Sequence, residues 1–146
     1  MNTRHIKRLA GWLTVTLGAG HLLGSVPLRL DAWRRMAETG LLSADVITPQ
    51  GAAEHEAAEA YWLSLGSFAA PTLLLGAYVV WAAGRDLRIP GALGWGLIAW
   101  GAVMLAFLRV SPALLLPVAG VLIILADRRE TRRSAADSPL PAAASR

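Results

Sequence analysis

The sequence contains no cysteine. This absence excludes disulfide bonds, thiolate catalysis and cysteine-ligated zinc or iron–sulfur centres. Charged residues are also scarce, at 16% of the 146 residues, against roughly 25% in ordinary soluble domains. Hydrophobic residues make up 55%, above the roughly 45–50% that is usual in such domains. The composition therefore favours a membrane protein.

Four stretches of the chain contain no Asp, Glu, Lys or Arg. They cover residues 9–28, 60–84, 89–108 and 110–126, with lengths of 20, 25, 20 and 17 residues. An α-helix needs about 20 apolar residues to cross a hydrocarbon core of roughly 30 Å. We therefore predict an all-α, integral membrane four-helix bundle over residues 9–127, with spans at about 9–28, 58–84, 89–108 and 112–127.

The basic residues are divided unevenly between the two sides of this bundle. Ten lie before the first span, between the second and third, or after the fourth, and four lie on the other side. The positive-inside rule then predicts both termini, including the basic segment 1–8, in the cytoplasm. We expect a multi-pass membrane protein whose basic face meets anionic lipid headgroups, and no nucleic-acid partner.

The connections carry their own signals. In the external connection 29–57, Asp31 and Gly40 are typical of the start and stop of a short amphipathic helix. Thr48 followed by Pro49 predicts the start of another helix. In the fourth span Pro117 predicts a kink, and residues 128–146 are expected to form a disordered basic tail.

Three predicted spans carry a face of small or polar residues, which is how helices associate in lipid. This pattern predicts a close-packed, left-handed bundle. A neighbouring GxxxG pair, Gly20 and Gly24, is expected to pack within the monomer rather than to form a dimer, although a homo-oligomer stays open. The three faces are Gly11, Thr14, Gly18, His21 and Ser25; Ala60, Ser64, Ser67 and Pro71; and Ala92, Gly96, Ala99, Val103 and Ala106.

His21 is the only histidine in the four charge-free stretches, which contain no lysine, arginine, aspartate or glutamate. A rise of about 1.5 Å per residue puts it roughly 10 Å inward from the outer end of its helix. Polar groups in membranes are costly and often functional. We therefore predict a site for a lipophilic small molecule in the outer half of the bundle, lined by His21, Ser64, Ser67, Trp100, Tyr61 and Arg109.

Two other interpretations of this site remain. In one, the protein is a membrane enzyme of the isomerase or cyclase type, with His21 or Glu59 as acid or base. In the other, it is a structural or accessory subunit, and His21 bonds a neighbouring helix only to lock the packing. His55 and Glu59 lie four residues apart and are weak candidates for a metal site, so no metal or other cofactor is predicted.

Several short motifs resemble a known family. They are Gly18-Ala-Gly-His21, Ala60-Tyr-Trp-Leu63, Pro90-Gly-Ala-Leu-Gly-Trp95 and Ser111-Pro-Ala-Leu-Leu-Leu-Pro117. Together they resemble a bacterial domain-of-unknown-function family of small four-span membrane proteins, which is similar in layout to the DoxX-like membrane proteins. The resemblance implies the fold and a bacterial membrane, and it supplies no activity. The long, acidic connection before the second span departs from the usual pattern.

Overall fold

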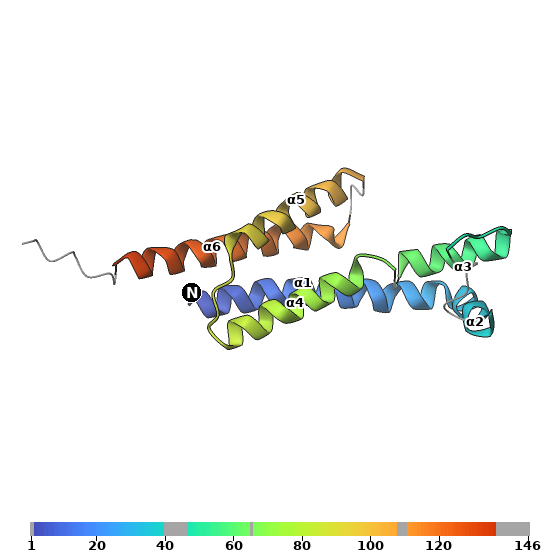
Figure 1. The fold of residues 1–146 in the computed structure, drawn as a ribbon, viewed down its shortest axis with the longest axis horizontal. Coiled ribbons are helices and arrows are strands. Elements are labelled where there is room, and N and C mark those ends of the chain that lie inside the picture. The colour runs from blue at the N-terminus through green and yellow to red at the C-terminus, as the bar shows by residue number, and fades with distance from the viewer. Residues whose placement is uncertain (1, 40–46, 65, 108–110, 137–146) are drawn as a thin grey trace, which may run out of the picture. The chain divides into compact units, whose positions relative to one another are not determined.

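A computed structural model describes residues 2–39, 47–64, 66–107 and 111–136. This part of the chain contains six α-helices, a short 3-10 turn and no strand, so the all-α prediction is confirmed. The elements, labelled in Figure 1, are α1 (Thr3–Leu28), α2 (Leu30–Thr39), α3 (Ala52–Leu63), α4 (Ala69–Gly84), α5 (Gly91–Phe107), the turn η2 (Pro112–Leu114) and α6 (Leu115–Ala136).

The chain forms two compact units. The first takes its described residues from Met1–Leu13 and Tyr78–Arg146, and the second is Thr14–Ala77. Helices α1 and α4 contribute residues to both. Each unit is described by itself below.

In the first unit, α5 and α6 form a tightly packed hairpin (Figure 1). Two glycines face each other at its centre: a methyl group added to Gly94 would lie 2.5 Å from the carbonyl oxygen of Gly120. About two turns further along α5, Gly101 lies against the ring of Pro117. Small residues thus set the close approach of α5 and α6 in this hairpin.

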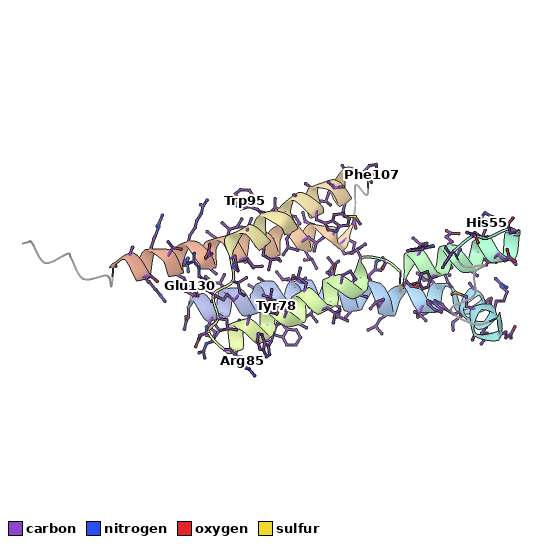
Figure 2. All side chains as sticks on the ribbon, in the orientation of Figure 1. His55, Tyr78, Arg85, Trp95, Phe107 and Glu130 are labelled. Carbon is purple, nitrogen blue, oxygen red and sulfur yellow. The ribbon has the colours of Figure 1, made fainter. Side chains whose placement is uncertain are left out.

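The buried face of α5 differs from the predicted one. Gly94, Leu97 and Gly101 are buried, whereas Gly96 has open space where a side chain would stand. The face predicted from heptad spacing is exposed along its whole length, because α6 packs against a neighbouring row of small residues. Figure 2 shows Trp95 and Phe107, which are also exposed, projecting away from α6. The exposed row is Ala92, Gly96, Ala99, Val103 and Ala106.

The start of α6 explains why Pro117 does not kink a helix. The hydroxyl of Ser111 accepts a hydrogen bond from the backbone N–H of Ala113 at 3.2 Å, which is typical of a capping serine, and Pro112 follows at the first position of η2. Pro117 is then the third residue of α6. The first backbone N–H groups of a helix have no intrahelical acceptor, so a proline costs little there. The predicted kink is wrong.

The other end of α6 corrects the predicted tail. The helix continues to Ala136, so residues 128–136 are helical rather than disordered. Side-chain hydrogen bonds one turn apart accompany this extension: Thr131 donates to the carbonyl of Asp127 at 3.0 Å, and Ser134 donates to that of Glu130 at 3.1 Å. The remaining residues of the predicted tail, 137–146, lie outside the described part of the chain.

In the second unit, α1 and α4 approach each other at Gly18. A methyl group there would lie 2.7 Å from the backbone nitrogen of Leu73 and 2.8 Å from the carbonyl oxygen of Ala69. Gly20 and Gly24, by contrast, have no atom within 4 Å of an added methyl group. The GxxxG pair therefore does not pack within the monomer as predicted. The glycine that does pack, Gly18, belongs to the predicted small-residue face of α1.

Helices α2 and α3 pack together in the second unit. Ala32 and Met36 of α2 pack with Ala58 and Ala60 of α3 in a small buried cluster. The predicted short helix is confirmed, although it begins at Leu30 and so includes Asp31 in its first turn, and the predicted stop at Gly40 lies outside the described residues. Arg29 bonds Glu59 at 3.0 Å and Arg35 bonds Glu56 at 2.6 Å, so two ion pairs also connect this part of the chain.

Helix α3 begins later than Thr48 and Pro49 predicted, at Ala52. The carboxylate of Glu54 accepts hydrogen bonds from the backbone N–H groups of Gln50, at 2.6 Å, and Gly51, at 3.1 Å. These bonds hold the pKa of Glu54 below its ordinary value of 4.5. A carboxylate at the third helical position that bonds the N-cap backbone in this way fixes the helix start.

The predicted second span is divided. Helix α3 ends at Leu63, α4 begins at Ala69, and the described residues between them are not helical. We call this segment, residues 64–68, the break. By length and composition one described helix, α1, qualifies as a membrane span, while α4 and α5 are apolar but shorter, at 16 and 17 residues. Four spans are therefore not established by the helices themselves.

Candidate functional site

His21 lies beside the break in the second unit. Its Nε2 atom is 2.8 Å from the carbonyl oxygen of Leu63, the last residue of α3. Its ring also packs against that of Phe68, with centroids 5.1 Å apart and planes inclined by 44°. A carbonyl oxygen only accepts hydrogen bonds, so Nε2 is the donor in this contact, and Nδ1 is the ring nitrogen left for a second contact. No partner of Nδ1 is found among the described residues.

The two serines predicted beside His21 serve the backbone at the break. Ser64 is fully buried, and its hydroxyl donates to the carbonyl of Ala60 at 2.6 Å. The hydroxyl of Ser67 donates to the carbonyl of Ser64 and accepts from the N–H of Ala69 at 3.1 Å. Together with the contact between His21 and the carbonyl of Leu63, these hydrogen bonds satisfy backbone groups that the interrupted helix leaves without partners. The serines thus shape the site rather than offer free donors.

The other residues predicted for this site differ in their surroundings. Tyr61 packs against the α2–α3 cluster and meets Trp62 edge to face at 5.2 Å. Its ring also lies against Gly66 of the break, where an added methyl group would be 2.7 Å from Cε1 of Tyr61. Trp100 belongs to α5 in the first unit, and 48% of its surface is exposed. Arg109 lies outside the described residues. The structure therefore places His21, Ser64, Ser67 and Tyr61 of the predicted set at the break.

His55 and Glu59 do not form the pair considered for a metal. Nδ1 of His55, which Figure 2 labels on α3, lies 2.8 Å from the carbonyl oxygen of Gly51. Glu59 instead bonds Arg29 of the linker before α2. Within the described ranges, no group of three or more histidine or acidic side chains could hold a metal ion.

The first unit contains a polar site that sequence reasoning missed. Lys7 of α1 is almost completely buried, with 2% of its side chain exposed. Its ammonium donates to the carbonyl of Leu87 at 2.8 Å and forms an ion pair with Glu130 of α6. The other carboxylate oxygen of Glu130 is buried without a partner in the described structure, and so is the hydroxyl of Thr3, one turn before Lys7.

One signal in the sequence could have singled out this lysine. Of the 14 basic residues, 13 are arginine, and Lys7 is the exception. A lysine ammonium is compact, whereas the planar guanidinium of arginine needs more room. Lys7, the one lysine of the sequence, is therefore suited to the buried position that it occupies.

Further ion pairs surround Lys7 in the same unit. Arg4 pairs with Asp86, a residue with a left-handed backbone at φ 56° in the turn after α4. Arg88 bonds Asp127 at 2.8 Å, which raises the pKa of the Arg88 guanidinium above its ordinary value. These pairs connect the start of α1, the α4–α5 turn and α6.

Residues 5–130 match the model of a family described as a family of unknown function, DUF6463. The chain belongs to this family. The match includes the His21 site as well as Lys7 and Glu130. Comparisons with curated proteins and with solved structures found no match. The family confirms the unknown-function part of the resemblance seen in the sequence, and the DoxX-like layout stays a prediction.

Proposed function

We propose that this protein crosses the bacterial inner membrane four times, with both termini in the cytoplasm, and binds a lipophilic molecule with a hydroxyl group at His21. The observation that carries the binding proposal is the set of contacts made by the His21 ring. Leu63 and Phe68 contact the ring, and Nδ1 has no partner among the described residues. A hydroxyl of a membrane-soluble molecule is a matching donor.

The membrane part of the proposal is supported by exposed apolar surface. Only 28% of the apolar window of α1 is buried within the chain. Leu23 is 76% exposed, Leu74 71% and Phe107 84%. Soluble monomers rarely leave extended apolar patches in water. A hydrocarbon environment gives these side chains a suitable solvent.

The break is compatible with a second crossing. Interrupted helices are tolerated within membranes where the freed backbone groups find other partners. Here His21, Ser64 and Ser67 provide such partners. Interrupted membrane helices are also common places for substrates to bind. The position of His21 at this break thus supports the binding proposal.

The test uses the full chain, purified from membranes in mild detergent, and mass spectrometry of the small molecules extracted from it. We expect a hydroxylated lipophilic molecule to co-purify with the wild-type protein. His21→Ala should reduce its amount about tenfold, since one lost hydrogen bond of about 1.4 kcal/mol corresponds to that factor. His55→Ala is the matched control, because His55 also bonds a backbone carbonyl at 2.8 Å. It should leave the amount unchanged.

The accessory-subunit alternative is favoured by one specific contact, the bond from His21 to the end of α3. For a purely structural clip, no molecule should co-purify with the wild type, and His21→Ala should lower the unfolding temperature alone. That result would overturn the binding proposal. The enzyme alternative has no comparable support, because its two candidate residues, His21 and Glu59, have separate partners, Leu63 and Arg29.

A further inference from the structure

The last turns of α6 carry four exposed arginines. The last residue of its charge-free part is Ala126, and the helix then continues for ten residues to Ala136. At about 100° per residue, the four arginines cover an arc of about 140° on one side of the helix. We call this set the arginine face; its members are Arg128, Arg129, Arg132 and Arg133.

The acidic residues of the same segment lie on the other side of the helix and have partners there. Asp127 accepts hydrogen bonds from Arg88, at 2.8 Å, and from the backbone N–H of Gly91, at 3.0 Å. Glu130, labelled in Figure 2, pairs with Lys7. The rotation of α6 is thus fixed by contacts with α1 and with the start of α5. Both carboxylates are directed away from the arginine face, which keeps a concentrated positive charge.

We propose that the arginine face binds the phosphate groups of anionic lipids in the membrane that holds the protein. This inference rests on the membrane part of the proposed function. Arginine is suited to the role because its guanidinium can bond two phosphate oxygens at once, whereas an ammonium acts as a point charge.

The place of the arginine face in the chain favours lipid over a soluble polyanion. Arg128 comes two residues after the charge-free part of α6, and Arg133 lies about 8 Å further along the helix axis. All four side chains therefore begin within about one Debye length of the end of the apolar segment, where an anionic surface attracts basic residues. The competing explanation is that the arginines only stabilise the C-terminal end of α6 through the helix dipole. In that case the arginine face would show no preference for anionic lipid.

Because the chain has no cysteine, a single reporter can be placed on this face. Ala136 is exposed and lies at the centre of the arc, eight residues after Arg128. An Ala136→Cys variant carrying a polarity-sensitive dye is reconstituted in vesicles of phosphatidylcholine alone, or with about 30% phosphatidylglycerol. We expect a blue shift and about twofold weaker quenching by neutral acrylamide with the anionic lipid. About 0.5 M salt should reverse both changes.

Two further variants of the dye-labelled Ala136→Cys protein test whether the arginine face causes the response to phosphatidylglycerol. Replacing all four arginines by glutamine should abolish the response to phosphatidylglycerol. The control is Arg34→Gln, which removes a 74% exposed arginine from α2 and should leave the response intact. Equal dye signals in both vesicles, or a response that survives the fourfold replacement, would overturn the inference.

Two further measurements separate the alternatives. Resistance of vesicle association to alkaline carbonate, in phosphatidylcholine alone, tests membrane insertion independently of lipid charge. A protein that inserts but does not respond to phosphatidylglycerol overturns the arginine-face inference and leaves the proposed function standing. Failure to insert overturns both. Inorganic phosphate or a short RNA that produces the dye response in neutral vesicles would assign the face to a soluble anion instead.

Discussion

Lys7 is held by contacts with two different elements of the first unit. Its ammonium bonds the carbonyl of Leu87 in the α4–α5 turn and pairs with Glu130 of α6. An ion pair of this kind adds little net stability when intact, because both charges lose hydration. Removing one partner is costly, since the other charge is then left without compensation. The main role of the Lys7–Glu130 pair is therefore to fix the arrangement of α1, the α4–α5 turn and α6.

We expect Lys7→Met to lower the free energy of unfolding by about 2–3 kcal/mol. The figure is below the roughly 3–5 kcal/mol of a fully buried pair, because a quarter of the Glu130 side chain is exposed. The double variant with Glu130→Gln should recover much of the loss, since no buried charge then remains. Chemical denaturation in detergent micelles measures these differences.

Arg8→Met provides the control for this prediction, because Arg8 is the next residue of α1 and is exposed. Its effect should stay within about 0.5 kcal/mol. A Lys7→Met protein as stable as the Arg8→Met protein would show that the buried pair is not formed.

At the residue scale, the sequence indicates that His21 matters but does not give its contacts. His21 interrupts an apolar run, which predicts a specific role, and the structure does give it specific contacts. Its acceptor, the carbonyl of Leu63, is not predictable, because backbone groups become available only where a helix ends and no proline marks such an end at Leu63. The burial of Lys7 is not predictable either, since it depends on distant partners such as Glu130.

Among the helices, α5 and α6 show how close packing depends on a single row of residues. A methyl group on Gly94 would lie 2.5 Å from a backbone oxygen of Gly120 and 2.8 Å from Ile124. Backbone cannot move aside without displacing the whole helix. The hairpin therefore tolerates no side chain at this point.

We expect Gly94→Ala to destabilise the protein by about 1–3 kcal/mol, the usual cost of overpacking. Gly96→Ala, two residues further along α5, is the matched control, because nothing lies within 4 Å of its added methyl group. Alanine is a better helix former than glycine, so this variant should be more stable by up to about 1 kcal/mol. Thermal unfolding of the two variants should therefore shift in opposite directions, and equal shifts would contradict the packing.

The same helices show where periodicity is insufficient. Heptad spacing in α5 identified the row of Gly96, whereas the row of Gly94 is the one that meets Gly120 of α6, and spacing within one helix cannot decide between neighbouring rows. In the second unit, length alone suggested one span over 58–84. The break arose instead from side chains that bond the backbone, namely Ser64 and Ser67, and this competition with regular helix is hard to read from composition.

For the whole molecule, the number of membrane crossings is the property that most needs measurement. Apolar stretches predict four, whereas α1 is the one described helix that meets the length and composition of a span. Single cysteines, labelled in intact cells with a membrane-impermeant maleimide, distinguish these cases. The sites Gln50, Leu87 and Ala136 lie between or beyond the predicted crossings, and Leu114 lies at the outer start of the fourth.

Four crossings with a cytoplasmic N-terminus predict that Gln50→Cys and Leu114→Cys are labelled in intact cells, while Leu87→Cys and Ala136→Cys react only after lysis. A protein with α1 as its sole crossing would place all four sites on one side. A protein in which α5 and α6 stay on the cytoplasmic side would differ at Leu114 alone, because the α5–α6 hairpin would not enter the bilayer. The labelling of Leu114 therefore decides whether the Gly94–Gly120 contact holds two membrane helices together or two helices outside the membrane.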